Sequence, residues 1–317
     1  MSICPASQQR QQGIAVITAL LLTTLAITIV ASLFWQQQVQ VRSIENQRLQ
    51  LQKQWILRGA LDWASLILRE DAKHSSVDNL EEPWAVPLAE TRLDQYVENG
   101  RADDNIADAT LSGSISDAQA RYNLTNLCTN GTINLAEVAA FERLLNNAQM
   151  SPALAQATAD MMAAAQKPPV ANAVNSDSQL GPQPMNFTQM EDLLAVPGFS
   201  PEMLDKLKDF VIFLPRATPV NVNTAPAEVL AARIDKLSLA GATSLVANRN
   251  TASFRDLADF VQRSQGKPFT ASASDASVTT NYFLVDGKVR MSRAGLNMQA
   301  LIERNGVNTK IIWIREY

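Results

Sequence analysis

The chain has 317 residues, of which 46% are hydrophobic and 18% are charged, and its formal net charge is −4. This length allows one large domain or two modest ones, with enough buried area for a hydrophobic core. The slightly acidic balance gives no electrostatic reason to expect a nucleic acid as a partner, because a polyanion is usually bound by a basic surface.

A long apolar segment stands near the N-terminus. Residues 14–35 read IAVITALLLTTLAITIVASLFW and contain no charged residue, no proline and no glycine. As a helix with a rise of ~1.5 Å per residue, this segment would be ~33 Å long, enough to cross the ~30 Å core of a bilayer. It therefore predicts one transmembrane helix, with Ile14, Thr18 and Trp35 among the anchoring residues. A buried helix of a soluble protein is the less favoured interpretation.

The residues after this segment do not form a secretory cleavage site, which would contain small residues. Residues 36–69 contain no proline, and apolar side chains in their second half recur at helical spacing. The residues of this stripe are Leu57, Ala60, Leu61, Ala64 and Leu68. We therefore expect the helix to leave the membrane and to continue to about Arg69. The few arginines on either side of the span do not fix its orientation.

A short polar leader ending in Gly13 stands directly before the span. This arrangement resembles the class III signal of type IV pilins and pseudopilins. The resemblance implies that a prepilin peptidase cleaves on the cytoplasmic side, after Gly13, and that Ile14 becomes the N-methylated first residue of the mature chain. Loss of residues 1–13 would remove Cys4 and leave Cys128 without an intrachain disulfide partner.

The fifth residue of this expected mature chain departs from the pilin pattern. Most pilins have a glutamate there, which pairs with the N-terminal amine of a neighbouring subunit, whereas this chain has Thr18. A carboxylate inside a bilayer is costly without a partner, so this subunit is not expected to make that pairing. The K-type minor pseudopilins of type II secretion typically lack the glutamate.

Three further segments are similar to this K-type family, the general secretion pathway protein K family. Residues 116–127 read SDAQARYNLTNL, residues 219–233 read PVNVNTAPAEVLAAR, and residues 282–317 are like the closing strands of the family. The resemblance runs almost from end to end. It implies an α+β, type IV pilin-like fold, in which a long N-terminal helix and a small antiparallel sheet carry a large, all-α, SAM-like insertion domain.

Helix signals dominate from about residue 132 to residue 264. Asn134 with Glu137, and Thr188 with Glu191, have the spacing of a capping box. Further helix starts are expected at Ser151-Pro152, at Ser200-Pro201, and at Thr224 with Pro226. The middle of the chain is therefore predicted to be a helical block.

Strand patterns stand on both sides of this block. Strands are expected at residues 110–116, 282–290, 296–303 and 310–315, where apolar residues alternate or lie between turn signals. One small sheet with a helical insertion explains this order. The predicted organisation is a leader at 1–13, a transmembrane helix at 14–35, an amphipathic helix and the first part of the pilin-like core at 36–127, the helical insertion at 128–275, and closing strands at 276–317.

Signals for catalysis and for metal binding are poor, and we expect no enzyme activity and no catalytic residue. The one histidine, His74, lies in a polar run and is expected at the surface, which leaves no Ser-His-Asp triad. One His and one mature Cys cannot build a zinc site. Cys128 is expected to be a small buried residue. Calcium is the single cofactor candidate, with Asp275 and Asp286 as ligands.

One alternative interpretation concerns the helical block. Residues 219–233 have the pattern expected before a helix-hairpin-helix, a unit that often binds DNA. The Gly-apolar-Gly turn of such units is missing, because residues 234–249 contain only Gly241. Residues 187–270 carry nine Lys/Arg and nine Asp/Glu, which leaves no basic surface for a polyanion. We therefore expect a protein-binding scaffold, with DNA uptake in competence as the alternative.

By the resemblance, the chain is expected to be a minor pseudopilin at the tip of the type II secretion pseudopilus. It would promote pseudopilus assembly and protein export across the outer membrane. The implied partners are the I- and J-type minor pseudopilins, with the H-type as a further candidate, the prepilin peptidase and the inner-membrane secretion platform, and no nucleic acid. The implied location is the bacterial inner membrane, single-pass, with a cytoplasmic N-terminus and a periplasmic C-terminal domain. A minor pilin of a type IV pilus is a second alternative.

Overall fold

The computed structural model describes residues 12–93, 109–166, 185–263, 271–291 and 294–317. Contacts between residues divide the chain into two compact units, residues 1–56 and residues 57–317. The first element, α1 (Gln12–His74), is a single helix that contains the boundary between them. The sequence predicted that this helix would reach about Arg69, and it ends five residues later, at His74. The basic side chains of its last turn interact favourably with the helix dipole and so favour a C-terminus there.

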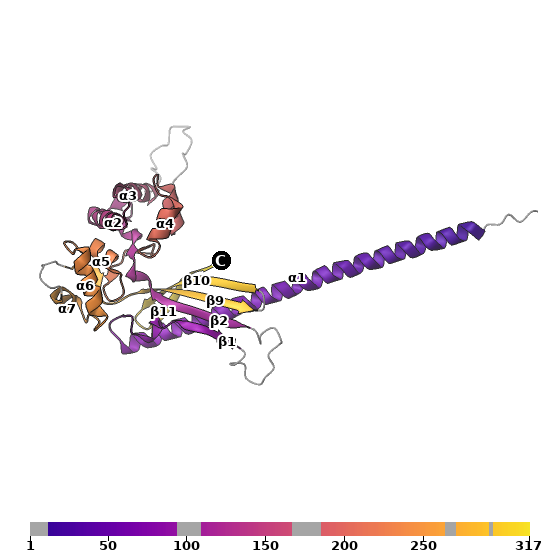
Figure 1. Ribbon diagram of the computed structural model, residues 1–317, viewed down its shortest axis with the longest axis horizontal. Coiled ribbons are helices and arrows are strands. Elements are labelled where there is room, and N and C mark those ends of the chain that lie inside the picture. Colours follow the sequence, from indigo (N-terminus) through magenta and orange to yellow (C-terminus); the bar gives the residue numbers. More distant parts are fainter. Residues whose placement is uncertain (1–11, 94–108, 167–184, 264–270, 292–293) are drawn as a thin grey trace, which may run out of the picture. The chain divides into compact units, whose positions relative to one another are not determined.

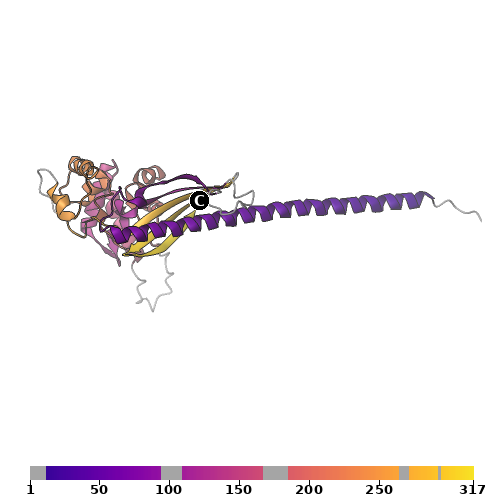
Figure 2. The ribbon, with the colours of Figure 1, turned by 90° about the horizontal axis from the view of Figure 1, so that it is seen from below.

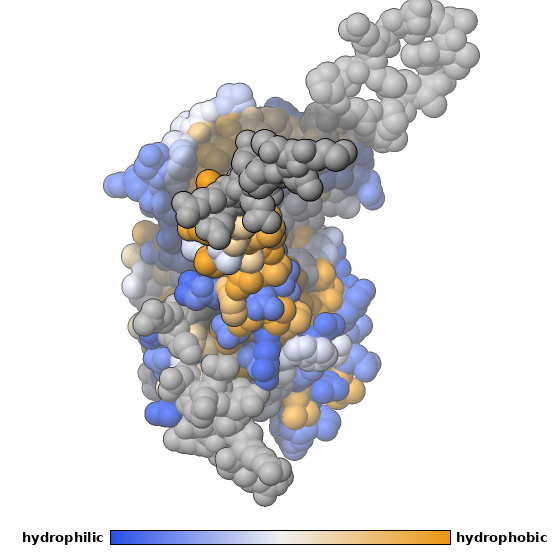
Figure 3. Space-filling model, turned by 90° about the vertical axis from the view of Figure 1, so that its right-hand side faces the viewer, coloured by the Kyte–Doolittle hydropathy of each residue, from blue (hydrophilic) through white to orange (hydrophobic). Residues whose placement is uncertain are grey.

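The first part of α1 is apolar on all sides. By length and composition, α1 could cross a membrane. Its large hydrophobic side chains are exposed, and Trp35 is 72% accessible. The Thr18 hydroxyl donates to the Ala15 carbonyl at 3.0 Å, and Thr28 does the same to Leu25 at 2.8 Å, so these polar groups are satisfied within the helix. Figure 3, in which the N-terminal end of α1 points toward the viewer, shows mainly hydrophobic residues along this helix. These features fit a membrane anchor.

The second unit contains one antiparallel sheet of five strands, in the order β1-β2-β9-β10-β11 (Figure 1). The strands are β1 (Leu88–Arg92), β2 (Thr110–Asp117), β9 (Tyr282–Met291), β10 (Ala294–Asn305) and β11 (Asn308–Glu316). The four strands predicted from the sequence are confirmed. The edge strand β1 was not predicted, because its LAETR sequence is largely polar and exposed.

The last part of α1 packs on the middle of this sheet. Leu57, Leu61 and Leu68 are fully buried, which confirms the predicted apolar stripe. Gly113 of β2 lies opposite Gly287 of β9. A Cβ atom added at Gly287 would lie 3.2 Å from the Leu57 side chain, so the absence of a side chain lets the helix approach the sheet closely.

The helical block stands between β2 and β9 in the chain, and it gathers at one end of the sheet in both views of the ribbon (Figures 1 and 2). Its helices are α2 (Leu135–Asn147), α3 (Ala153–Gln166), α4 (Pro201–Leu207), α5 (Ala227–Arg233), α6 (Leu239–Arg249) and α7 (Leu257–Gln262). A large apolar core of its own holds the block together. The predicted α+β class and pilin-like arrangement are thereby confirmed.

Short strands also occur inside the block. The prediction of an all-α insertion is therefore wrong in this detail. The pairs are β3 (Tyr122–Asn123) with β6 (Val211–Ile212), β4 (Cys128–Thr129) with β5 (Thr132–Ile133), and β7 (Val220–Asn221) with β8 (Ala276–Ser277). The first and third pairs are parallel and join segments that are distant in sequence. Two-residue pairings of this kind leave no periodic pattern, so they escape prediction from sequence.

The helix starts agree with the predictions at two positions and differ at two others. Asn134 caps α2 and Ser200 caps α4, as expected. The predicted capping box at Thr188 lies one residue later, because Asp192 accepts from the backbone of Gln189 at 3.0 Å and opens the 3₁₀ helix η5 (Met190–Ala195). Thr224 does not cap α5, because its hydroxyl is donated to a buried carboxylate elsewhere.

Candidate functional site

The predicted processing site lies in the first turn of α1, which contains Gly13 and Ile14. Cleavage after Gly13 and methylation of Ile14 stay predictions. The other two predicted anchor residues, Thr18 and Trp35, are exposed on the same helix. Residues 1–11 of the predicted leader lie outside the described part of the chain.

The two internal sequence motifs, residues 116–127 and residues 219–233, meet in the folded chain. Asp117, at the end of β2, accepts hydrogen bonds from Asn221 Nδ2 at 2.8 Å and from Thr224 Oγ1 at 2.6 Å. Asp117 also accepts from the backbone N–H of Gln119 at 2.7 Å. Complete burial raises the pKa of Asp117 to about 6, although these donors act in the opposite direction.

Two asparagines of the first motif extend this polar seam. Asn123 accepts from the Leu214 N–H at 3.1 Å and donates to the Arg216 carbonyl at 2.7 Å. Asn126 exchanges two hydrogen bonds with the backbone of Thr218, at 2.9 and 3.0 Å. Side-chain amides have both donors and acceptors, so each asparagine can replace a missing strand partner. Asn123 and Asn126 thus hold two segments of the block together, whereas the bonds of Asp117 attach the block to the end of β2.

The second motif is held from its other side by α6 and the loop after it. Arg249 is buried and donates from Nη1 to the Val222 carbonyl at 2.8 Å, and burial lowers its pKa to about 10. Asn223 exchanges hydrogen bonds with the backbone of Phe254, at 2.7 and 2.9 Å. The Asn-x-Asn-Thr-Ala-Pro segment is therefore a rigid junction, and its polar groups serve the fold.

A buried carboxylate cluster lies at the C-terminal end of α1. Asp71, Asp78 and Glu82 place carboxylate oxygens within 4.8 Å of one another. Arg304 of β10 donates to Asp71 at 2.7 Å and also binds Asp78, and Trp84 donates from Nε1 to Glu82 at 2.8 Å. The guanidinium group supplies one positive charge to this cluster of three carboxylates. The cluster therefore acts as an ionic lock between α1 and the sheet.

The two calcium candidates have other partners. Asp275 forms an ion pair with Arg233 at 3.0 Å, and Asp286 accepts a hydrogen bond from Gln299 at 2.9 Å. Neither belongs to the cluster of potential metal ligands found among the described residues. Calcium binding at these positions stays a prediction.

The predicted environments of His74 and Cys128 are confirmed. His74 is exposed and lies 3.1 Å from Glu70 on the same helix. Cys128 is buried, and its Sγ lies 3.4 Å from Oε1 of Gln166.

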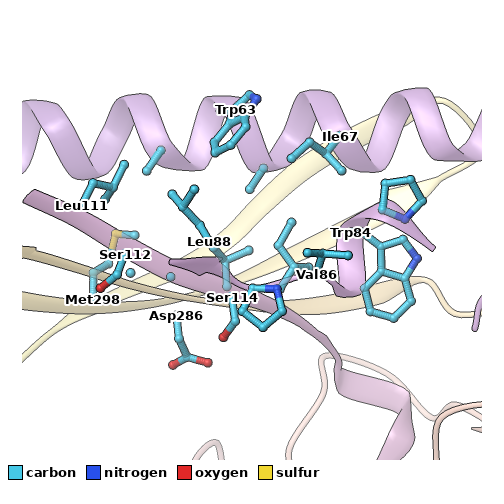
Figure 4. A pocket seen from close by; sticks show the side chains of 18 residues that line it. Trp63, Ile67, Trp84, Val86, Leu88, Leu111, Ser112, Ser114, Asp286 and Met298 are labelled. Carbon is cyan, nitrogen blue, oxygen red and sulfur yellow. The ribbon is translucent and has the colours of Figure 1, made fainter. Parts of the chain in front are cut away.

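An apolar groove of about 260 Å³ lies between the last part of α1 and the β1–β2 side of the sheet (Figure 4). Trp63 and Ile67 line it from the helix, and Leu88, Leu111 and Met298 line it from the strands. Figure 4 shows Asp286 and Ser114 on the side of the strands away from the helix, so the space under α1 is apolar. Prediction from sequence missed this groove, because it depends on the unpredicted strand β1.

Large hydrophobic side chains are exposed at the mouth of the groove. Trp63 is 49% accessible and Val86 is 69% accessible. Exposed apolar groups rimmed by polar residues are typical of surfaces that bind another protein. Together with the rigid junction, this surface favours an assembly function over a catalytic one.

Comparisons with known proteins identify similar chains. Two models described as "Type II secretion system (T2SS), protein K" match residues 120–216 and 220–280. A Type II secretion system protein K of Pseudomonas aeruginosa is 29% identical over 299 residues, which covers 89% of this chain and 85% of that protein. The matched segments contain the junction and the helical block described above.

A solved structure has a similar fold. It is described as the GspK-GspI-GspJ complex from the type 2 secretion system of enterotoxigenic Escherichia coli. The similarity has a TM-score of 0.67 at 19% identity, and it covers 87% of this chain and 99% of the other. At this identity the similarity shows a shared fold.

Proposed function

Because this chain belongs to the family of type II secretion system protein K, we propose that it works as a minor pseudopilin at the tip of the secretion pseudopilus. There it helps the pseudopilus to assemble and thereby promotes protein export across the outer membrane. The single observation that carries the tip position is the helical block inserted between β2 and β9.

The physical argument is steric. The block lies at one end of the sheet and has its own apolar core, so it is too bulky for a further pilin-like subunit to stack there. The hydrogen bond from Thr224 of the second motif to Asp117 holds the block to the end of β2. Asn123 and Asn126 bond to Arg216 and Thr218, directly before that motif, and hold two segments of the block together. A rigid block ends a fibre, whereas a mobile one could move aside.

The membrane helix supports the same proposal. The first part of α1 anchors the subunit in the inner membrane, with the N-terminus in the cytoplasm and residues 57–317 in the periplasm. Thr18 replaces the glutamate that most pilins use to pair with a neighbour's N-terminal amine. Its hydroxyl bonds within its own helix instead, which suits a subunit that needs no neighbour ahead of it.

The partners follow from the similar solved structure, which contains GspK together with GspI and GspJ. We extend this to the chain described here and propose the I- and J-type minor pseudopilins as its neighbours. The inner-membrane secretion platform and the H-type pseudopilin complete the set of proposed contacts.

The decisive experiment measures the intact mass of the membrane-extracted protein from cells with and without prepilin peptidase. We expect a loss that corresponds to residues 1–13, plus one methyl group, only when the peptidase is present. An uncleaved mass in both strains would contradict the pseudopilin pathway and leave an ordinary single-span membrane protein.

A further inference from the structure

The strand β11 is the last strand of the sheet and has a neighbour on one side only, β10. Antiparallel strands alternate between residues that bond to the neighbour and residues whose backbone groups point away from it. Asn297 and Tyr317 exchange both backbone hydrogen bonds, at 3.2 and 3.1 Å, which sets the phase of this alternation. Counting back from Tyr317, the backbone N–H and C=O of Ile314 point away from β10.

The same alternation applies at the other end of β11. The two-residue turn between Asn305 and Asn308 makes this pair a bonded one, so the backbone groups of Thr309 and Ile311 also point outward. The structure shows no second strand against them within the described residues. β11 therefore presents an open edge, a form of surface that proteins normally cover or protect.

The side chains along this edge are sorted by face. Ile311 pairs with Ile302, and Ile314 pairs with Ala300, which places both isoleucines on one face of the sheet. Ile314 is 45% accessible, so the edge exposes a large apolar side chain. The edge thus offers an apolar row beside unpaired backbone groups.

The opposite face of the edge is basic. Lys310 pairs with Glu303, and Arg315 pairs with Gln299, so both lie on the other face and both are exposed. The described residues provide no ion-pair partner for either, and the Arg315 guanidinium stacks 4.3 Å above the Trp313 ring. Glu303, which faces Lys310, pairs with Arg216 at 3.0 Å, so a partner strand would meet the exposed cations Lys310 and Arg315.

These charges argue against a second copy of the chain as the occupant. If β11 paired with itself in antiparallel fashion with Ile311 opposite Ile314, then Lys310 would lie opposite Arg315 on both sides of the symmetry axis. Like charges directly opposite each other destabilise a strand pair. The edge instead fits a strand that carries acidic residues at those positions.

We propose that β11 is completed in the pseudopilus by a β-strand of a neighbouring minor pseudopilin. The residues of that strand are apolar where they face Ile311 and Ile314, and acidic where they face Lys310 and Arg315. Main-chain hydrogen bonds provide the affinity and the alternating side chains provide the selectivity. This inference rests on the proposed function, because the partner strand belongs to a neighbouring subunit of the pseudopilus.

The test uses the full-length chain, coexpressed with tagged I- and J-type minor pseudopilins and extracted in detergent. Ile314→Pro removes an outward-pointing N–H without removing a bond to β10, and proline is tolerated at such edge positions. A second variant, Lys310→Gln with Arg315→Gln, removes the two charges without touching the backbone and without placing a carboxylate opposite Glu303. Lys288→Glu, an exposed change on β9 away from the edge, is the matched control.

We expect recovery of the chain with its partners to fall about tenfold in the proline variant and in the double charge variant, and to stay unchanged in the control. If the proline variant fails to fold, the double charge variant alone tests the strand proposal. Wild-type recovery in the charge variant, or in a folded proline variant, would overturn the strand proposal and leave the proposed function intact.

Two other outcomes are distinguishable. If the wild-type chain copurifies with neither the I-type nor the J-type pseudopilin, then the proposed partners are contradicted, and the strand proposal fails as well. If the chain alone forms a dimer that Ile314→Pro abolishes, then the edge belongs to a second copy and the proposal is wrong. Light scattering of the purified chain measures this.

Discussion

Thr224 Oγ1 donates a hydrogen bond of 2.6 Å to Asp117 Oδ2 across 107 residues of sequence, and both residues are buried. Replacing Thr224 by Val keeps the shape but removes the donor, so a buried carboxylate oxygen loses a partner. We expect a loss of ~1–3 kcal/mol in the free energy of unfolding. Chemical denaturation of the detergent-solubilised chain, followed by tryptophan fluorescence, measures it. Thr224→Ser, which keeps the hydroxyl, is the control and should lose much less.

The pKa of Asp117, raised by burial to about 6, predicts a pH dependence. The folded chain binds a proton at this site more tightly than the unfolded chain, whose Asp has its ordinary pKa of about 4. The contribution of Asp117 to stability therefore falls as the pH rises from about 4 to about 6, and it stays low above that. The pKa values of Asp71, Asp78 and Glu137 are also raised by burial, so they add to this trend.

We expect the wild-type chain to melt at a higher temperature at pH 5 than at pH 7.5, because these groups bind protons more tightly in the folded chain. In Asp117→Asn the difference between the two pH values should be smaller, because one titrating group is gone. An equal difference in both proteins would show that Asp117 does not titrate in this range. Thermal melts of both proteins in matched buffers provide the measurement.

The ionic lock at the end of α1 gives a larger expected effect. Arg304→Met removes the guanidinium group that binds Asp71 and Asp78, and leaves two buried carboxylates without their counter-charge. Breaking a buried pair in this way costs ~3–5 kcal/mol. The matched control is Arg290→Met, whose exposed pair with Glu90 spans 3.7 Å and should contribute ~0–1 kcal/mol. A comparable loss in both variants would contradict the lock.

Periodic features of this chain were predictable from its sequence. The uncharged run of α1, its stripe of Leu57, Leu61 and Leu68, and the strands β2, β9, β10 and β11 all follow from apolar spacing. The stripe of α1 and the strands β9 and β10 bury apolar side chains, and the first part of α1 is apolar on all sides, so each leaves a recognisable pattern in the residues. The helix caps at Asn134 and Ser200 were predictable for a local reason, because a capping side chain bonds to its own helix.

The junction and the groove were not predictable in the same way. Asp117, Asn123 and Asn126 stood in a motif, but their partners lie about 90 to 107 residues away, and no local rule pairs them. Thr224 had the position of a helix cap and instead serves Asp117. The groove depends on β1, whose polar sequence carries no strand signal. Polar contacts between segments distant in sequence, and edge strands with a polar sequence, could therefore not be predicted from the sequence.

Two glycines of the second unit should respond in opposite ways to substitution by alanine. A Cβ atom at Gly113 would lie 2.5 Å from the backbone carbonyl oxygen of Asp286 in the neighbouring strand, so β2 would have to shift. We expect Gly113→Ala to lose ~1–3 kcal/mol of stability. Gly59, in α1, has no atom within 4 Å of its added Cβ, so Gly59→Ala should gain ~0.5–1 kcal/mol from helix propensity. Denaturant midpoints of the two variants, measured side by side, check both signs. A stabilised Gly113→Ala would show that the two strands are not in this close contact.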